Sequence, residues 1–171
     1  MDYLITDLKQ YIGSALIGVS EYQAVTVMVG LIALLILILP GRRTADRIFT
    51  ACLILYLYMV FSTTVLIRAE SGAHKAMLMP FWSYRKAITS SYFRYEVLEN
   101  ILLFVPAGLL LGILKGRPAS ILYLMLFSIA IEALQYSLRV GLCEFDDVFN
   151  NTLGSAIGYV AGWIISRITR R

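Results

Sequence analysis

The sequence predicts an all-α fold: a polytopic bundle of about five transmembrane helices, with an amphipathic or interfacial helix at the N-terminus. Two observations carry this prediction. Of the 171 residues, 59% are apolar and 15% are charged, whereas soluble domains are typically about half apolar and about a quarter charged. The apolar residues also form long runs, several of which approach the roughly 20 residues that cross a bilayer. We therefore expect lipid to be the main solvent of this fold.

The expected elements follow in order along the chain. One stripe at helical spacing predicts the N-terminal amphipathic helix and consists of Leu4, Leu8, Tyr11, Ala15 and Val19. Apolar segments then predict membrane spans at about residues 24–39, 48–67, 98–114, 119–138 and 148–168. We expect residues 1–171 to form one domain. The first two spans carry hydrophobicity alone, whereas the last three also carry polar side chains.

A connector of residues 68–96 separates the second span from the third. Its aromatic residues are expected in a segment that rests at headgroup level, and it is long enough to shape a lid or a re-entrant turn. In the third span, the purely apolar stretch of residues 101–114 rises only about 21 Å at 1.5 Å per residue. Glu99 and Asn100 are therefore expected at the membrane edge or just below it.

Basic residues in the short turns predict the orientation. Lys and Arg gather in the turns at 42–47 and 115–117 and in the tail at 167–171, whereas the turn before the fifth span is acidic. The positive-inside rule then places the N-terminus outside and the C-terminus in the cytoplasm. These basic residues form no stripe on a polar face, so the formal charge of +4 does not indicate nucleic acid.

The expected topology brings polar side chains of three spans to one side of the membrane. Ionisable groups at membrane depth are costly and usually face a bundle interior or a wet cavity. The candidate binding residues of such a pocket are Glu99, Asn100, Glu132, Gln135, Asp146, Asp147 and Asn151. Carboxylates and amides suit a divalent cation, a cationic ligand or proton exchange, and the candidate metal ligands are Glu132, Asp146 and Asp147.

A plainer interpretation of the same residues stays open. Glu132 and Gln135 can form hydrogen bonds between helices, while Asp146 and Asp147 can cap the fifth helix, where acidic side chains favour the positive end of the helix dipole. Small residues at intervals of four predict close helix packing, in the third span and in the fifth, at Gly108, Gly112, Gly154, Gly158 and Gly162.

Three strings stand in order in the second half of the chain: ENILLFVPAG at 99–108, IEALQ at 131–135 and EFDDVFNNTLG at 144–154. Together, over about residues 96–168, they resemble the VanZ-like family, to which a Met-Pro-Phe element at 79–81 is also similar. Members of that family are bacterial membrane proteins named for resistance to teicoplanin, a lipoglycopeptide. The resemblance implies signature positions at Glu99, Asn100, Glu132, Gln135, Asp146, Asp147, Asn151 and Gly154.

The sequence leaves three functions open and does not decide whether the chain is an enzyme. The favoured one is a non-enzymatic envelope protein that lowers lipoglycopeptide binding at the cell surface. The second is an intramembrane enzyme that acts on a lipid-linked envelope substrate through its carboxylates. The third is a small proton-coupled transporter that uses Glu132, with a homodimer packed through the Gly154 face as one arrangement. The expected partners are the bilayer and a lipid-linked cell-wall precursor or a lipoglycopeptide.

Overall fold

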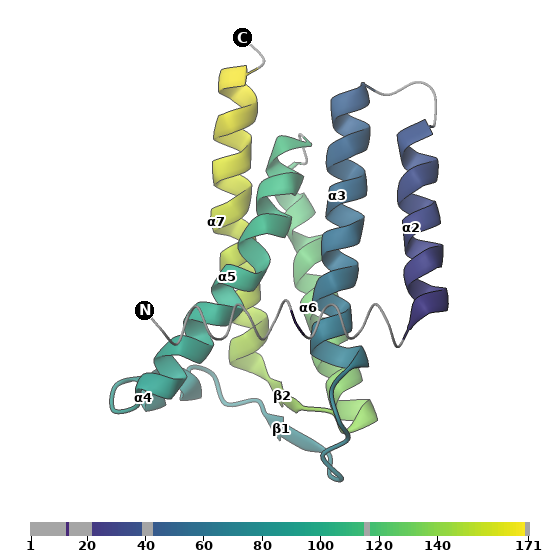
Figure 1. The fold of residues 1–171 in the computed structure, drawn as a ribbon. Coiled ribbons are helices and arrows are strands. Elements are labelled where there is room, and N and C mark those ends of the chain that lie inside the picture. The colour runs from purple at the N-terminus through teal and green to yellow at the C-terminus, as the bar shows by residue number, and fades with distance from the viewer. Residues whose placement is uncertain (1–12, 14–21, 39–42, 115–116, 170–171) are drawn as a thin grey trace. The chain divides into compact units, whose positions relative to one another are not determined.

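The computed structural model describes residues 13, 22–38, 43–114 and 117–169 (Figure 1). In these residues the fold is all-α, as the sequence predicts, with one short pair of strands besides. The chain divides into two compact units, Met1–Arg68 and Ala69–Arg171, which we describe separately. The N-terminal helix predicted around residues 4–19 falls outside the described residues, except for Gly13.

The first unit pairs α2 (Gln23–Ile38) with α3 (Thr44–Phe61), which continues into the π-helix η1 (Ser62–Leu66). Two contacts join the start of α2 to the end of α3. The hydroxyls of Thr26 and Tyr58 are 2.6 Å apart, and the Tyr22 hydroxyl donates to the Leu66 carbonyl at 2.8 Å. The two helices are therefore antiparallel.

The second unit contains α4 (Trp82–Ala87), α5 (Ser91–Ile113), the short 3-10 helix η2 (Pro118–Ser120), α6 (Ile121–Leu138) and α7 (Phe145–Thr169). Strands β1 (Lys75–Met77) and β2 (Leu142–Glu144) pair in parallel, with Ala76 opposite Cys143. The sequence did not predict these strands, because three residues are too few to display the two-residue period of a strand. They join the connector to the turn that precedes α7.

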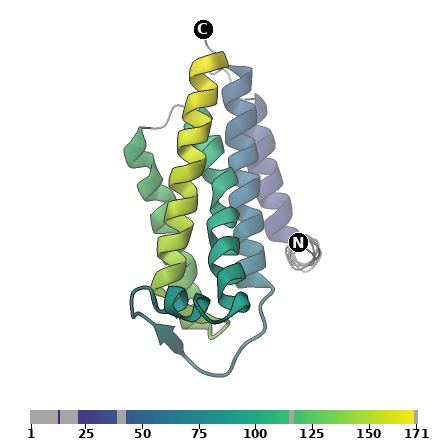
Figure 2. The same ribbon diagram turned by 90° about the vertical axis from the view of Figure 1, so that its left-hand side faces the viewer.

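Glycines set the distance between α5 and α7, which lie side by side in both views (Figures 1 and 2). A Cβ at Gly158 would lie 2.0 Å from the carbonyl oxygen of Val105, and one at Gly108 would lie 2.1 Å from that of Ser155. Equally close backbone approaches, of 2.3, 2.0 and 2.1 Å, occur at Gly112, Gly154 and Gly162. No side chain fits at such distances, so glycine permits this close, parallel packing.

The packing of α7 also bears on the homodimer considered above. The face of α7 that carries Gly154 meets the backbone of Ile101 on α5 of the same chain, with a would-be Cβ only 2.0 Å from its carbonyl oxygen. That face is therefore already covered. A homodimer of this chain would have to use another surface.

Three helical segments in the described part of the chain are long and apolar enough to cross a membrane: Thr44–Leu66, Ser91–Ile113 and Pro118–Leu138. They correspond to the second, third and fourth expected spans. The apolar helix α2 has 16 described residues, and α7 has 25 residues but carries polar side chains along its first turns. The first and fifth spans, the single domain and the orientation stay predictions.

The third helix begins earlier than the sequence indicated. It starts at Ser91 rather than near residue 98, and Asn100 therefore lies well inside it. Its 23 residues rise about 34 Å at 1.5 Å per residue. The whole helix is therefore long enough for the bilayer, although the apolar stretch of residues 101–114 alone is not. Three of the seven missed residues, 91–97, are aromatic and three are polar or charged, and residues 91–96 were expected in the connector at headgroup level.

Candidate functional site

Polar side chains gather at one end of the second unit, where α5 and α7 begin and α6 ends. The segment that contains β1 and α4 lies at the same end (Figures 1 and 2). We call this region the polar cap. Its members are residues 81–84 with Asn100, Ser128, Glu132, Glu144, Asp146, Asp147, Asn150 and Asn151.

Asp146 is the most enclosed carboxylate of the polar cap, with no exposed surface. Its Oδ1 accepts the backbone N–H of Phe81 at 2.6 Å, and its Oδ2 accepts the N–H and the hydroxyl of Ser83 at 2.9 and 2.6 Å. Both carboxylate oxygens thus bind the connector. The sequence left helix capping and ligand binding open for Asp146, and the observed contacts with the connector are of a third kind.

The hydrogen bond to Phe81 coincides with an unusual backbone conformation. Phe81 has φ 59°, in the left-handed region, which costs a bulky residue roughly 1–2 kcal/mol. The charged acceptor on α7 helps to offset this cost, because hydrogen bonds to carboxylates are among the stronger ones. The Met-Pro-Phe string marked this position in the sequence, but nothing in the string indicated Asp146 as its partner.

The next residues of α7 contact three other helices. Asp147 Oδ1 accepts the side-chain amide of Asn100 on α5 at 2.6 Å. Asn150 accepts the hydroxyl of Tyr84 on α4, and Asn151 donates to the Ser128 hydroxyl on α6 at 2.8 Å. The start of α7 therefore ties the polar cap together, and sequence reasoning missed the contributions of Tyr84, Ser128 and Asn150.

Two glutamates connect α6 and α4 through β2. Glu132 Oε2 accepts the backbone N–H of Glu144 at 2.9 Å, and Glu144 Oε2 accepts the indole N–H of Trp82 at 3.0 Å. Burial, with a smaller contribution from the charge of Asp146, raises the pKa of Glu144, although the Trp82 hydrogen bond opposes this shift. Glu144 therefore keeps its proton to a higher pH than a solvated glutamate does.

Two neighbours of these carboxylates also hold their protons more firmly. Burial raises the pKa of the Cys143 thiol, and the charges of Glu132, Asp147 and Glu144 add to the effect. Burial, followed by the charge of Asp146, raises the pKa of Tyr84. Cys143 is a free thiol. The polar cap is therefore a region of negative potential.

The remaining candidates lie on α5 and α6. Gln135 is buried on α6, one turn beyond Glu132, and Glu99 is half-buried on α5 beside Asn100. The described residues contain no group of three or more His, Cys, Asp or Glu side chains placed to hold a metal ion. Glu132, Asp146 and Asp147 do not form such a group, and both oxygens of Asp146 already accept hydrogen bonds from the connector.

Two side-chain atoms of the polar cap are buried without a hydrogen-bond partner: Asn150 Nδ2 and Asn151 Oδ1. Their residues are 1% and 4% exposed. Leaving a buried polar group unsatisfied costs roughly 1–3 kcal/mol. A water molecule or a polar ligand group beside either atom would therefore be stabilised.

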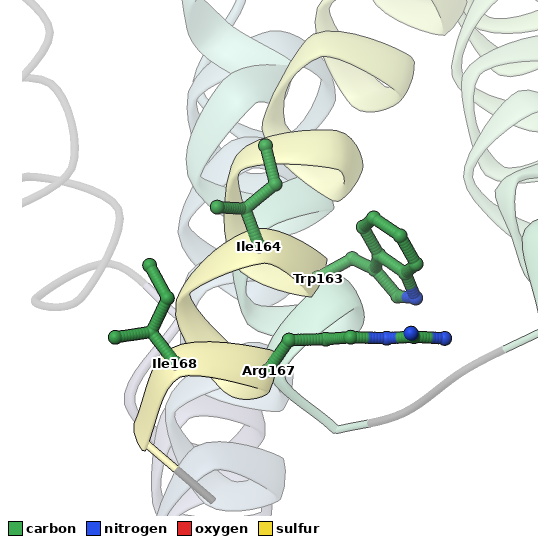
Figure 3. A pocket seen from close by; sticks show the side chains of 4 residues that line it. All are labelled: Trp163, Ile164, Arg167 and Ile168. Atoms are coloured by element: carbon green, nitrogen blue, oxygen red, sulfur yellow. The ribbon is translucent and has the colours of Figure 1, made fainter. Parts of the chain in front are cut away.

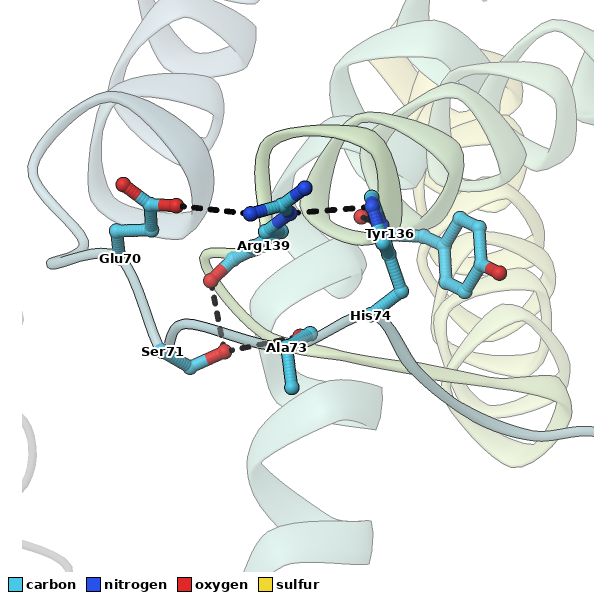
Figure 4. Close-up of polar contacts among 6 residues, drawn as sticks. All are labelled: Glu70, Ser71, Ala73, His74, Tyr136 and Arg139. Carbon is cyan, nitrogen blue, oxygen red and sulfur yellow. Dashed lines mark hydrogen bonds and ion pairs between the residues drawn. The ribbon is translucent and has the colours of Figure 1, made fainter.

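A second polar cluster fixes the connector to the end of α6 (Figure 4). Arg139 ends α6 with φ 58°, and its carbonyl accepts the N–H and the hydroxyl of Ser71 at 2.6 and 2.7 Å. Arg139 Nε donates to His74 Nε2 at 3.1 Å, and His74 Nδ1 lies 2.8 Å from the Tyr136 carbonyl. Because the Arg139 donor makes Nε2 the acceptor, Nδ1 is the ring atom available to donate to the Tyr136 carbonyl.

The opposite end of α7 carries a shallow cavity of about 280 Å³. It is lined by Trp163, Ile164, Arg167 and Ile168, and the Arg167 guanidinium stacks over the Trp163 ring, 4.4 Å from its centroid (Figure 3). An aromatic ring paired with a cation is typical of a membrane interface. No residue of the polar cap lines this cavity.

The comparisons with known proteins agree with the resemblance seen in the sequence. Over 66 residues the chain is 30% identical to Protein VanZ of Enterococcus faecium, a match that covers 37% of this chain and 41% of that protein. The matched part of this chain thus spans about two fifths of the length of that relative. No solved structure matches the chain. The family model described as VanZ/LLP1 matches residues 47–166, more than half of the chain, and this chain therefore belongs to the VanZ/LLP1 family.

Proposed function

We propose that this chain is an integral membrane protein of the bacterial cell envelope that lowers the binding of lipoglycopeptides such as teicoplanin at the cell surface. Membership of the VanZ/LLP1 family and three helices apolar enough to cross a membrane support the proposal. The polar cap is the part of the molecule that we hold responsible.

One observation carries this assignment. The strings that resemble the VanZ-like family are far apart in the sequence, yet their polar members meet in the polar cap. Phe81 of the Met-Pro-Phe element binds Asp146 of the last string. Asn100 binds Asp147, and Glu132 binds the backbone of Glu144. Shared motifs that converge in space indicate a common site more strongly than motifs that serve separate helices.

The surface beside these contacts suits an amphiphilic ligand. Phe81 is 47% exposed, and its ring makes edge contacts with Phe149 and Tyr84, at centroid distances of 5.3 and 5.7 Å. Next to these rings, the Phe81 backbone binds Asp146 and the Tyr84 hydroxyl binds Asn150. A lipoglycopeptide or a lipid-linked cell-wall precursor offers both an apolar portion and hydrogen-bonding groups, so either can engage such a surface.

The test compares cells of a teicoplanin-susceptible host that express the chain or its Asp146→Asn variant at equal membrane levels. We expect the unaltered chain to reduce the amount of fluorescent teicoplanin bound per cell, with unchanged cell-wall precursors, and the variant to lose most of that reduction. The Arg117→Gln variant, changed at an exposed residue outside the polar cap, is the matched control. Unchanged teicoplanin binding, or a reduction that always accompanies modified precursors, contradicts the proposal.

A second candidate is an enzyme that acts on a lipid-linked envelope substrate. It is favoured by the raised pKa of Glu144, since acid–base groups with shifted pKa values are common in active sites. Purified protein would then convert lipid extracts of the host, with a loss of turnover in Glu144→Gln and not in Arg117→Gln. Extracts left unchanged by the purified protein would remove this candidate.

A further inference from the structure

The connector has a one-sided charge. From Ser71 to Tyr95 the sequence contains no Asp or Glu, whereas Lys75, Arg85, Lys86 and Arg94 are all basic. All four basic residues are exposed. None of them forms an ion pair with a carboxylate of the described residues, in contrast to Arg139, which lies 3.7 Å from Glu70. None of these four charges is thus neutralised by a direct ion pair with a carboxylate of the described residues.

Exposed apolar side chains lie among these cations. Leu78, Met79, Phe81, Ile88 and Tyr92 are each about half exposed or more, with Ile88 reaching 79%. Apolar side chains interleaved with Lys and Arg are typical of segments that lie in the interface of a membrane. The segment lies where α5 begins and α6 ends, and both helices are long and apolar enough to span the bilayer (Figure 1). Spanning helices of this kind would bring the segment to the interface.

The segment is also held in place before any lipid binds. Asp146 fixes the backbone at Phe81 and Ser83. The Arg94 guanidinium donates to the Ala87 carbonyl at 3.0 Å and to the Ser91 hydroxyl at 2.6 Å, which joins the end of α4 to the start of α5. Cations mounted on a fixed backbone lose less conformational entropy on binding than cations on a disordered tail.

We propose that residues 75–94 form an interfacial collar that binds the phosphate headgroups of anionic phospholipids in the surrounding membrane. The four cations contact the phosphates, and the exposed apolar side chains enter the acyl boundary. Charge complementarity selects anionic over zwitterionic lipid. This inference concerns the bilayer and does not rest on the proposed function.

The two tryptophans of the chain make the collar testable, because Trp82 lies in it and Trp163 lies near the far end of α7. In the Trp163→Phe variant of the full chain, the tryptophan fluorescence comes from Trp82. In the Trp82→Phe variant, it comes from Trp163. Each protein is reconstituted in phosphatidylcholine vesicles that contain a minor fraction of brominated lipid, either phosphatidylglycerol or phosphatidylcholine. Bromine quenches the fluorescence of a nearby indole. For each tryptophan, the ratio of quenching by brominated phosphatidylglycerol to quenching by brominated phosphatidylcholine therefore measures lipid preference.

We expect brominated phosphatidylglycerol to quench Trp82 about twofold more than brominated phosphatidylcholine, with the excess falling at high salt. The triple change Lys75→Gln, Arg85→Gln and Lys86→Gln should abolish the excess at Trp82 and leave Trp163 quenching unchanged. Arg117→Gln should change neither. Equal quenching of Trp82 by the two lipids, or an excess that survives the triple change, overturns the collar.

Two controls separate this result from other failures. Trp82 emission in pure phosphatidylcholine should be the same with and without the triple change, because the indole hydrogen bond to Glu144 does not involve the altered residues. The vesicles contain no antibiotic. A failed collar therefore leaves the proposed function standing, and a failed teicoplanin test leaves the collar standing.

Discussion

Asp146 and Ser83, 63 residues apart in the sequence, are joined by two hydrogen bonds to the same carboxylate oxygen, one from the Ser83 backbone and one from its hydroxyl. Both residues are buried. The pair holds the connector against the start of α7 and thereby determines which side chains the polar cap presents.

Asp146→Asn should destabilise the second unit. The amide keeps one acceptor but turns an Nδ2 donor toward the N–H of Phe81 or Ser83, so at least one buried donor loses its partner. We expect a loss of about 2–4 kcal/mol, measured as a lower midpoint of thermal unfolding in detergent. Asp147→Asn is the control, because its Oδ1 can still accept the Asn100 amide. Equal midpoints for the two variants would contradict the role of Asp146.

Gly158→Ala should disrupt the contact between α5 and α7. The added Cβ would meet the Val105 carbonyl at 2.0 Å, and since the neighbour is backbone, the helices must separate. A loss of about 2 kcal/mol or more is expected, up to failure to accumulate in the membrane. Gly30→Ala is the control on α2, where nothing lies within 4 Å of the new Cβ, and helix propensity there favours alanine. If Gly158→Ala were as stable as Gly30→Ala, the close packing of α5 against α7 at Gly158 would be refuted.

Ser128→Ala should cost about 1–2 kcal/mol, since it removes the acceptor of the Asn151 amide inside the protein. Ser137→Ala on the same helix is the matched control, because the Ser137 hydroxyl is exposed and donates to the Ala133 carbonyl one turn back. Denaturation in a mixed-detergent series compares the two. A Ser137 variant that loses as much stability as the Ser128 variant would show that the Asn151 contact contributes little.

Glu144→Gln should change how stability depends on pH. The folded state raises the pKa of Glu144 above its ordinary value of 4.5, so the folded protein binds this proton more tightly than the unfolded chain does. The stability that this proton adds to the folded state is fully present below the pKa of Glu144 in the unfolded chain. It is lost as the pH rises through the pKa of Glu144 in the folded protein. The glutamine side chain does not titrate, so the variant does not lose this stability as the pH rises. Its amide oxygen can still accept the Trp82 indole N–H.

Thermal midpoints of the unaltered chain and Glu144→Gln should therefore diverge as pH rises from about 4 toward neutrality, with the variant the more stable at neutral pH. The difference between the two proteins is the relevant quantity, because other carboxylates titrate in both. A constant difference across that range, or a variant that becomes relatively less stable with rising pH, would show that folding does not raise the pKa of Glu144.

Much of the architecture could be predicted from the sequence, because hydrophobic runs report helices directly. The bounds of α6 and the glycine spacing of α5 and α7 follow from short-range patterns of this kind. The early start of α5 could not be predicted, since its first turns are aromatic and polar rather than apolar. The strand pair β1 and β2 was also missed, because pairing between residues distant in sequence leaves no periodic signal in so short a segment.

The candidate site could be predicted only in part. The shared side of Asn100 and Asp147 follows from topology, and the structure brings these two residues into contact. The partners of Asp146 did not follow, because the binding groups are mainly backbone N–H groups of the connector, which no residue pattern displays. The hydroxyls of Tyr84 and Ser128 were likewise hidden in segments that read as aromatic or apolar.

The central claim is that the Asp146 carboxylate holds the connector against α7, and amide hydrogen exchange of the full chain in lipid nanodiscs tests it most directly. The N–H groups of Phe81 and Ser83 should exchange slowly in the unaltered protein and at least about tenfold faster in Asp146→Asn, while amides in the middle of α5 stay unchanged. Rapid exchange of both N–H groups in the unaltered protein, or equal rates in the two proteins, would contradict the claim.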